Sequence, residues 1–291
     1  LDEADRMLDM GFQQALDDII SYMPKQRQTL LFSATYPAKI EKTAQRIMQS
    51  PVMVEVQDSH SKQSIVQSLY EVENDDARLE AVRLLLQAHQ PETTLIFCNT
   101  KIETDQLANE LRAVGYEALA LHGDLEQKQR DQTLVRFANR SASVLVATDV
   151  AARGLDIEAL DLVINYQIAR ELEVHTHRIG RTGRAGAQGI ACTLHTQKEN
   201  HKIGLLEDYL KQKLERDDLP PISLLRQPAF SPPMVTIQIG GGKKQKVRAG
   251  DIVGALTGVD GIPGSDIGRI QVGDQWAYVA VTQEHGNTAF N

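Results

Sequence analysis

The sequence predicts an α/β fold with a mainly parallel sheet that helices cover on both faces, followed by a small, truncated α+β domain. Three observations predict this fold. Segments with strand and helix patterns alternate along most of the 291 residues. Two strand segments, VLVAT and LVIN, are almost entirely apolar, which is typical of central strands in a parallel sheet. A proline-rich stretch at 217–233 then separates the alternating part from a differently patterned end.

Residues 1–58 form the first predicted domain. Apolar residues recur at helical spacing in 11–22 (GFQQALDDIISY), so that its phenylalanine, leucine and isoleucines share one face. A second helix is predicted at 38–49, and strands are predicted at 28–33 and 52–56. The polar, unpatterned residues 57–64 predict a linker to the next domain.

Residues 59–215 form the second predicted domain and contain most of the alternating segments. Strands are predicted at 66–72, 93–98, 116–120, 143–147, 161–166 and 189–194. Helices are predicted at 76–89, 101–114, 125–138, 171–180 and 197–214. Because helices join the consecutive strands, we expect the strands to run parallel and the helices to lie on both faces of the sheet.

A linker at 216–232 and a partial domain at 233–291 complete the predicted organisation. The stretch 217–233 holds five of the ten prolines, so we expect a stiff, extended linker. In the partial domain, 234–239 alternates like a half-buried strand, 249–258 has the pattern of a helix, and 266–281 that of a hairpin around Gly273.

Composition restricts the classes of function. The formal net charge of −8 argues mildly against a nucleic-acid binder, so such a function must rest on local clusters of basic residues. The two cysteines, Cys98 and Cys192, lie in apolar runs, which favours reduced core thiols. No spacing of cysteine and histidine fits a zinc site, and no apolar run reaches the roughly 20 residues of a membrane span.

Two short motifs in the first domain carry groups suited to nucleotide hydrolysis. In Asp2-Glu3-Ala4-Asp5, one carboxylate can orient Mg²⁺ through its waters while its neighbour activates the attacking water. Taken alone, the acidic run fits a helix start equally well, because carboxylates favour the positive end of the helix dipole. Ser33-Ala34-Thr35 ends a predicted strand, where small hydroxyl residues can relay hydrogen bonds or cap a helix.

The segment 177–184 (HRIGRTGR) carries the strongest local signal. On a helix, its arginines Arg178, Arg181 and Arg184 would lie within about a third of a turn of one another. Guanidinium groups so close repel one another unless an anion lies between them, and a triphosphate is a suitable anion. The alternative is a solvated basic face, which the two glycines between the arginines disfavour because glycine destabilises a surface helix.

Six segments together resemble the ordered motif series of DEAD-box RNA helicases. They are DEAD (2–5), SAT (33–35), LIFCNT (95–100), HGDLEQKQR (122–130), ATDVAARGLDI (147–157) and HRIGRTGR (177–184). The resemblance covers about residues 1–215. It implies that 1–58 is the end of a first RecA-like domain, that 59–215 is a second RecA-like domain, and that ATP and RNA close the two on each other.

The resemblance implies roles in ATP hydrolysis for five residues. Glu3 is the expected catalytic base, and Asp2 is expected to orient the hydration shell of Mg²⁺. Arg181 and Arg184 match the two arginine fingers that contact the triphosphate. Asp156 matches the residue that contacts the ribose. The implied cofactors are therefore ATP and Mg²⁺.

The resemblance also implies residues for domain coupling and for RNA binding. Those expected to link the ATP site to domain closure are Asp5, Ser33, Thr35, His177 and Arg178. Those expected to hold the RNA backbone are Asn99, Thr100, Gly123, Gln127, Arg130 and Thr148. Such contacts read RNA shape and 2′-hydroxyls rather than sequence. A purely structural role is the alternative for His122, and Asp124 and Asp149 fit turn or capping positions equally well.

The end domain offers two candidate RNA-binding features. Four basic residues fall within six positions of GGGKKQKVR, namely Lys243, Lys244, Lys246 and Arg248. Such a loop either contacts phosphates or only keeps the protein soluble. Trp276 and Tyr278 lie two positions apart and so share one face of a strand, where they either stack bases or belong to the core.

The segments GGGKKQKVRAGDIVGALTG, IGRIQV and YVAV resemble the RRM-like tail of the DbpA subfamily of DEAD-box helicases. This resemblance implies docking on a hairpin of 23S ribosomal RNA, pre-50S ribosomal particles as partners, and a cytoplasmic monomer with no membrane partner. The alternatives are a general DEAD-box helicase in mRNA turnover or cold adaptation, and an ATP-independent RNA-binding module.

We expect the chain to be a fragment of a longer gene product. Only Leu1 precedes the acidic motif, and no G-x-x-x-x-G-K-[ST] phosphate loop occurs in the sequence. By itself the chain is therefore expected to be inactive as an ATPase.

Overall fold

The computed structural model describes residues 1–9, 11–33, 36, 38–55, 65–152, 160–183, 188–258 and 261–290. The chain divides into two compact units, Leu1–Ser59 and His60–Asn291. Within the described residues, no helix combines the length and the apolar character that crossing a membrane requires.

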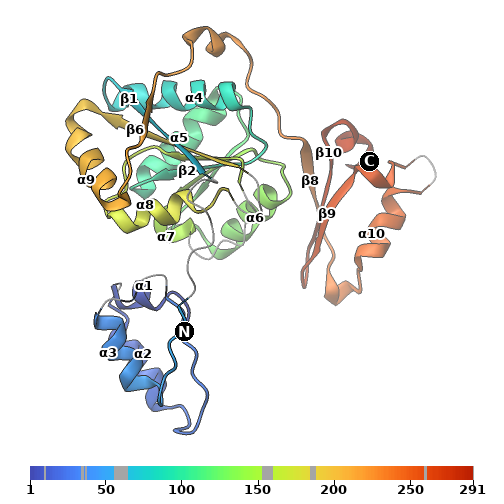
Figure 1. Ribbon diagram of the computed structural model, residues 1–291. Coiled ribbons are helices and arrows are strands. Elements are labelled where there is room, and N and C mark those ends of the chain that lie inside the picture. Colours follow the sequence, from blue (N-terminus) through green and yellow to red (C-terminus); the bar gives the residue numbers. More distant parts are fainter. Residues whose placement is uncertain are drawn as a thin grey trace. The chain divides into compact units, whose positions relative to one another are not determined.

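The first unit is helical in its described part. It contains α1 (Ala4–Asp9), α2 (Gln13–Ser21) and α3 (Ala38–Ile47), which Figure 1 shows in blue. Leu8 of α1, Leu16 of α2 and Ile40 of α3 bury their side chains together in a small core. The helices predicted at 11–22 and 38–49 are therefore confirmed, although both are shorter than expected.

The strands predicted in the first unit are wrong for the residues that the structure describes. Residues 28–33 and 52–55 have no regular secondary structure. In the first of these segments, Phe32 N–H donates to Leu1 O over 2.8 Å, and Phe32 O accepts from Ala4 N–H over 3.0 Å. An apolar pattern shows where a strand can pair, but a ladder forms only along a partner of sufficient length. The backbone hydrogen bonds of Phe32 with residues 1 and 4 are too few to form a ladder.

The second unit is built on a parallel sheet with the strand order β3-β4-β2-β5-β6-β1-β7. The strands are β1 (Ile65–Val72), β2 (Thr94–Cys98), β3 (Ala118–Leu121), β4 (Val144–Thr148), β5 (Leu162–Asn165), β6 (Gly189–Thr196) and β7 (Glu215–Asp217). Neighbouring strands in this order run parallel to each other. The six strands predicted in 59–215 are confirmed. The polar strand β7 carries no apolar pattern that could have predicted it.

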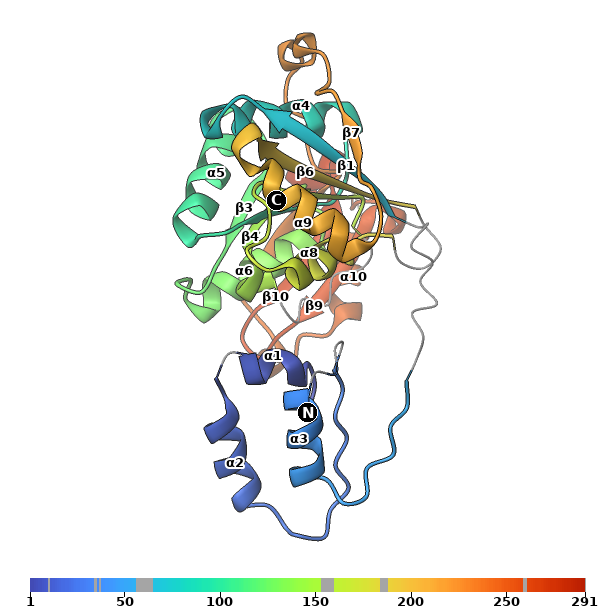
Figure 2. The same ribbon diagram turned by 60° about the vertical axis from the view of Figure 1, so that its left-hand side comes forward.

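Helices cover both faces of this sheet (Figures 1 and 2). They are α4 (Arg78–His89), α5 (Lys101–Ala113), α6 (Gln127–Ala138), α7 (Asp149–Ala152), α8 (Leu172–Ile179) and α9 (Asn200–Leu210). Alternate residues of each strand face opposite sides. Ile96 of β2 therefore packs in the core under α4 and α5, while Phe97 packs in the core under α6, α7 and α8. The predicted α/β fold is confirmed.

Both cysteines lie inside this sheet. Cys98 and Cys192 are fully buried and unpaired. Burial raises the pKa of the Cys192 thiol to about 12, and it also raises the pKa of the Cys98 thiol. The prediction that they are core thiols is confirmed.

The end of the chain folds as a small antiparallel sheet in the order β8-β10-β9. Its elements are β8 (Met234–Ile239), α10 (Ala249–Leu256), β9 (Ile267–Val272), β10 (Ala277–Thr282) and α11 (Gly286–Phe290). Ile252 of α10 packs against Val279 and Val281 of β10 in a separate core. The predicted strand, helix and hairpin are all confirmed.

Candidate functional site

The acidic motif lies at the start of α1 in the first unit. The Asp2 and Glu3 side chains are exposed, and Asp2 Oδ1 accepts the backbone N–H of Glu3 over 3.0 Å. The backbone of Glu3 is left-handed, with φ of 49°. Such a conformation is unfavourable for a residue with a side chain, and strained positions of this kind cluster at functional sites. The two carboxylates are thus presented to solvent by an unusual turn.

Asp5, by contrast, is buried beside the second hydroxyl motif. Its side chain is only 6% exposed, and its backbone N–H donates to Ser33 Oγ over 3.2 Å. These residues are 28 positions apart in the sequence, so the fold joins the DEAD and SAT motifs directly. Thr35 lies outside the described residues.

In the second unit, the buried guanidinium of Arg178 joins three strand ends. Its Nε and Nη2 donate to the two carboxylate oxygens of Asp149, after β4, over 2.6 and 2.8 Å. Nη2 also donates to Oδ1 of Asn99, after β2, over 2.8 Å, and Nη1 donates to the backbone oxygen of Gln167, after β5, over 2.8 Å. The guanidinium also lies 5.1 Å from the centroid of the Phe97 ring. Ligand sites of parallel sheets lie at this carboxyl edge.

The two residues after β2 have their side chains engaged within the protein. Asn99 donates through Nδ2 to Ile168 O over 3.1 Å in addition to accepting from the arginine. Thr100 is the N-cap of α5, where its Oγ1 accepts the backbone N–H of Glu103 over 3.2 Å and donates to Glu103 Oε2 over 2.6 Å. Hydrogen bonds within the domain therefore orient both side chains.

The other candidates for RNA binding lie around the start of α6 and the end of β4. Gly123 and Gln127 are exposed, and Thr148 is half-buried. Arg130 donates through Nη2 to Ala151 O over 2.8 Å, so it connects α6 with α7. A β-carbon at Gly123 would meet no heavy atom within 4 Å, so this backbone is open to a close neighbour.

The arginine motif does not form one helical face, which corrects the sequence-based expectation. Helix α8 ends at Ile179, and Gly180 is its C-cap. Arg178 points into the protein, where the carboxylate of Asp149 neutralises its charge. The sequence predicted that an anion lies between the arginines. For Arg178, this anion is the carboxylate of Asp149 in the protein itself. Local helical spacing could not reveal that a carboxylate 29 positions earlier would reach the guanidinium.

The turn after α8 carries Arg181, which is half-exposed. Leu160 N–H donates to Arg181 O over 3.1 Å, and Gly183 has a left-handed φ of 68°. A β-carbon at Gly189, the first residue of β6, would lie 2.3 Å from the backbone nitrogen of Gly183. Two glycines therefore allow the turn to pass close to the sheet. His177 is half-exposed on α8. Arg184 and Asp156 lie outside the described residues.

A neutral histidine lies close to Arg178. His175 on α8 is 1% exposed, and its Nε2 lies 3.2 Å from Oε1 of Gln67. Burial, with the neighbouring charge of Arg178, lowers the pKa of His175 to about 4. His122 is also buried, and its Nε2 lies 3.0 Å from Asp105 Oδ1, which fits the structural alternative for this residue.

The basic residues at 243–248 belong to an ordered loop, residues 240–248, which we call the basic loop. Lys243 N–H donates to Gly273 O over 2.8 Å, and Lys244 N–H donates to Asp274 O over 2.9 Å. A β-carbon at Gly242 would lie 2.4 Å from Gly273 O, so the loop rests closely on the turn of the hairpin. The side chains of Lys243, Lys244, Lys246 and Arg248 are all exposed. The hydrogen-bonded backbone thus presents four cations at the surface.

The aromatic pair lies outside the core. Trp276 is 41% exposed and Tyr278 is half-buried, whereas Ala277, Val279 and Val281 are fully buried in the core under α10. Of the two readings left open by the sequence, the core reading is wrong.

Two residues that organise the site have no role assigned from the sequence. Asp149 is the carboxylate partner of Arg178, and its position directly after the apolar strand VLVAT was the available signal. Gln167 accepts the backbone N–H of Asn99 over 3.0 Å and donates to Glu103. No local pattern marks Gln167, because the partners of its side chain are 64 and 68 positions away.

The fold and site define the class of protein. Three family models match: DEAD/DEAH box helicase over 1–43, helicase conserved C-terminal domain over 77–186, and DbpA RNA binding domain over 236–291. The Escherichia coli DEAD-box protein SrmB, solved bound to regulator of ribonuclease activity A, is 30% identical with a TM-score of 0.52, over 97% of its chain and 58% of this one. Saccharomyces cerevisiae Dbp5 bound to RNA and ADP BeF3 is 31% identical with a TM-score of 0.65, over 58% of its chain and 75% of this one. The chain belongs to the DEAD-box helicase family.

Within that family the chain is similar to the ATP-dependent RNA helicase DbpA of Escherichia coli K12. The two are 47% identical over 290 residues, which are 100% of this chain and 63% of the relative. The chain therefore spans less than two thirds of the relative's length. The resemblance to DbpA-type DEAD-box helicases is confirmed by this relative and by the family model of the tail.

Proposed function

We propose that the chain is part of an ATP-dependent RNA helicase, an enzyme that couples ATP hydrolysis to the local separation of short RNA duplexes. The observation that carries this proposal is the junction at Arg178. This arginine shares a motif with Arg181, a candidate for contact with the triphosphate. Its guanidinium also bonds Asn99, a candidate for RNA contact, and Asp149, which follows the candidate Thr148. Movement of the motif toward a triphosphate would shift the RNA-holding residues through buried hydrogen bonds.

The residues proposed to act on ATP and Mg²⁺ lie in both units. Glu3 is the proposed base for the attacking water, Asp2 the residue that orients Mg²⁺ through its waters, and Arg181 and Arg184 the triphosphate contacts, with Asp156 at the ribose. The donor set fits Mg²⁺, which keeps most of its waters and needs only one or two carboxylates. Among the described residues no group of three or more candidate ligands could enclose a metal. When bound, Mg²⁺ neutralises charge that develops on the phosphates.

Closure of the two RecA-like domains is the proposed coupling step. Asp5, Ser33, Thr35, His177 and Arg178 are the residues proposed to transmit it. The hydrogen bond from Asp5 N–H to Ser33 Oγ supports this coupling role, because it connects the acidic motif directly with the Ser33-Ala34-Thr35 motif. RNA held by Asn99, Thr100, Gly123, Gln127, Arg130 and Thr148 is proposed to bend on closure. A continuous duplex cannot follow such a bend, and ATP supplies the preference for the closed state.

The proposed target is a hairpin of 23S ribosomal RNA in pre-50S particles, which the end domain would recognise. The protein is proposed to act as a monomer in the cytoplasm. The exposed cations of the basic loop, Lys243, Lys244, Lys246 and Arg248, support RNA binding there. The match of 236–291 to the DbpA RNA binding domain supports an RNA-directed tail. The solved RNA complex of the structural neighbour Dbp5 supports RNA binding by the core.

The test is RNA-stimulated ATPase activity of a complete two-domain helicase that contains this sequence. We expect Glu3→Gln or Arg181→Ala to lower stimulated turnover by about 10³-fold or more, because they remove the base and a contact to developing charge. Glu41→Gln, an exposed glutamate on α3, is the control and should leave turnover unchanged. Turnover that survives both site substitutions would reject the enzymatic assignment.

A competition experiment tests the proposed target separately. The ribosomal hairpin should displace a labelled RNA from the protein far better than an unrelated RNA of equal length and charge. Equal displacement by the two RNAs would point to the general DEAD-box alternative instead.

A further inference from the structure

The hydroxyl group of Thr100 is engaged twice by one residue, Glu103. Its Oγ1 accepts the backbone N–H of Glu103 over 3.2 Å and donates to Oε2 of the same residue over 2.6 Å. An ionised carboxylate accepts hydrogen bonds but cannot donate them, so the direction of the second bond is settled. A hydroxyl group has one proton and two acceptor lone pairs. Thr100 has therefore used its proton and one lone pair, and one lone pair remains.

A second side chain holds the Glu103 carboxylate in this direction. Gln167, after β5, donates through Nε2 to Glu103 Oε1, so each carboxylate oxygen accepts from a different residue. The amide of Gln167 is oriented in turn, because its Oε1 accepts the backbone N–H of Asn99 over 3.0 Å. Hydrogen bonds to a charged group are about twice as strong as neutral ones. We therefore expect the bond between Thr100 and Glu103 to persist when RNA binds.

The charge of Glu103 affects which group of a nucleic acid can approach Thr100. Both residues are half-buried, and Thr100 follows β2 at the carboxyl edge of the sheet, where ligands of parallel sheets bind. A phosphate next to the hydroxyl group would lie close to a carboxylate of the same sign, and like charges repel strongly where water is partly excluded. A neutral group that donates a hydrogen bond is therefore the better match for the remaining lone pair.

The backbone of RNA contains one group of this kind. Its phosphate, ester and ring oxygens only accept hydrogen bonds, whereas the ribose 2′-hydroxyl both donates and accepts. The backbone of DNA lacks this hydroxyl group and therefore offers no donor. A threonine that can only accept is thus complementary to RNA and has no partner in the backbone of DNA.

We propose that Glu103 is a positioning residue that makes Thr100 an acceptor for a ribose 2′-hydroxyl, and that this pair contributes to selectivity for RNA over DNA. The inference rests on the proposed function, in which Thr100 contacts the RNA backbone. Glu103 acts through the direction of one hydrogen bond and does not itself touch the RNA.

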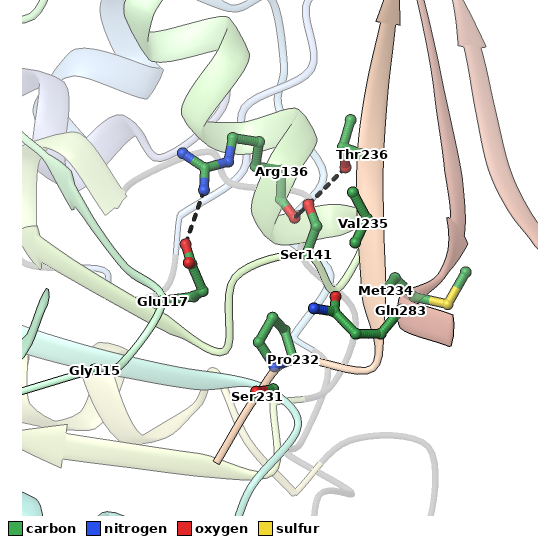
Figure 3. A pocket seen from close by; sticks show the side chains of 10 residues that line it. All are labelled: Gly115, Glu117, Arg136, Ser141, Ser231, Pro232, Met234, Val235, Thr236 and Gln283. Atoms are coloured by element: carbon green, nitrogen blue, oxygen red, sulfur yellow. Dashed lines mark hydrogen bonds and ion pairs between the residues drawn. The ribbon is translucent and has the colours of Figure 1, made fainter. Parts of the chain in front are cut away.

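A crevice elsewhere in the second unit is a poorer place for such selectivity. It holds about 240 Å³, and Glu117, Arg136, Ser141 and Pro232 are among the residues that line it (Figure 3). Sites for small molecules usually hold about 300–1,000 Å³. The Arg136 guanidinium is paired there with Glu117 over 3.1 Å, and none of the lining residues is a candidate for RNA contact. The crevice therefore offers no donor or acceptor set for a ribose.

The ratio of two affinities in a complete two-domain helicase that contains this sequence tests the inference. Labelled single-stranded RNA and DNA of one sequence are titrated with the protein, Mg²⁺ and a non-hydrolysable ATP analogue. In Glu103→Gln, the new amide oxygen must accept from Gln167, so its NH₂ group donates to Thr100 and reverses that bond. We expect the preference for RNA over DNA to fall about three- to tenfold, the range of one hydrogen bond. Partial unfolding would weaken both affinities and leave their ratio unchanged.

Removing the hydroxyl group should have the same effect. We expect Thr100→Val to lower the preference by a similar factor, and Thr100→Val/Glu103→Gln to lower it no further, because both changes act on one contact. The matched control Glu110→Gln makes the same charge change two turns along α5, where Glu110 accepts from Gln106 over 3.0 Å. It should leave the ratio unchanged. An equal fall in the control, or no fall in either site variant, would overturn the inference.

Modified RNA separates a donating ribose hydroxyl from an accepting one. A 2′-fluoro group cannot donate a hydrogen bond, and a 2′-deoxy sugar has no polar group at this position. With single substitutions along the RNA, we expect one position where both changes weaken binding about three- to tenfold in the unchanged protein, and neither does in Thr100→Val. Tolerance of fluorine at a position where deoxyribose is not tolerated would overturn the inference and leave RNA binding by Thr100 intact. Failure of the unchanged helicase to bind any RNA would reject the proposed function, and the inference with it.

Discussion

Arg178 and Asp149 form a bidentate ion pair between α8 and the end of β4, with nitrogen–oxygen distances of 2.6 and 2.8 Å. The Arg178 side chain is 1% exposed and that of Asp149 is 24% exposed. The same guanidinium bonds the side chain of Asn99 and the backbone of Gln167. One residue of the arginine motif thus serves the inside of the domain, and the proposed contact with a triphosphate is left to Arg181 and Arg184.

Removing the carboxylate of this pair should destabilise the second unit strongly. Asp149→Ala leaves a buried guanidinium without its counter-charge, and we expect a loss of about 3–5 kcal/mol in the free energy of unfolding. Urea unfolding of the whole chain measures it. The control Glu92→Ala breaks an exposed pair with Arg140 and should cost less than about 1 kcal/mol. A similar small cost for both variants would show that Arg178 does not depend on Asp149.

The stability of the second unit should fall in mild acid because of His175. Its pKa is lowered to about 4 by burial, from an ordinary value near 6.5. Between these values the unfolded chain binds a proton that the folded chain does not, so stability decreases as pH falls. From pH 7 to pH 5 the contribution of His175 lowers the free energy of unfolding by about 2 kcal/mol. The glutamine of His175→Gln does not titrate. Urea unfolding at several pH values should therefore show that the stability of this variant falls less between pH 7 and pH 5 than that of the unchanged protein. Identical pH profiles for the two proteins would contradict the assignment.

Gly189 should not tolerate a side chain. In Gly189→Ala the β-carbon would lie 2.3 Å from Gly183 N and 2.5 Å from Thr182 Oγ1, so the turn that carries Arg181 must move. We expect a cost of about 1–3 kcal/mol in thermal or urea unfolding. Gly204→Ala in α9 is the matched control, because its β-carbon meets nothing within 4 Å. That change should stabilise the protein by up to about 1 kcal/mol, since alanine favours a helix. A neutral result for Gly189→Ala would indicate that the turn is free to shift.

Neutralising part of the basic loop should weaken RNA binding in a salt-dependent way. In Lys243→Ala/Lys244→Ala, the slope of log affinity for a ribosomal hairpin against log salt should fall by about two, one for each phosphate contact. The measurement is a fluorescence titration at several salt concentrations. Lys198→Ala/Lys202→Ala makes the same charge change on exposed residues away from the loop. Equal slopes in the two variants would mean that the loop only contributes net charge.

Much of the fold could be predicted from the sequence because its signals are local. The strands and helices of the second unit follow from apolar runs and helical spacing, and VLVAT and LVIN form the interior strands β4 and β5 of the sheet. The motif order was sufficient to indicate the family, since each motif is contiguous. The strands expected at 28–33 and 52–56 were wrong for the described residues, because strand formation depends on a partner that local patterning does not encode.

The sequence by itself determined the alternation of strands and helices, the position of every motif, and the cluster of cations at 243–248. Only the tertiary structure decided that Arg178 is internal and paired with Asp149, and that Trp276 lies outside the core against Lys128. The physical reason is the separation along the sequence over which each effect acts. Backbone preference and hydrophobic period act over a few neighbouring residues, whereas desolvation of a charge or the covering of a sheet face depends on groups that the chain brings together from distant positions.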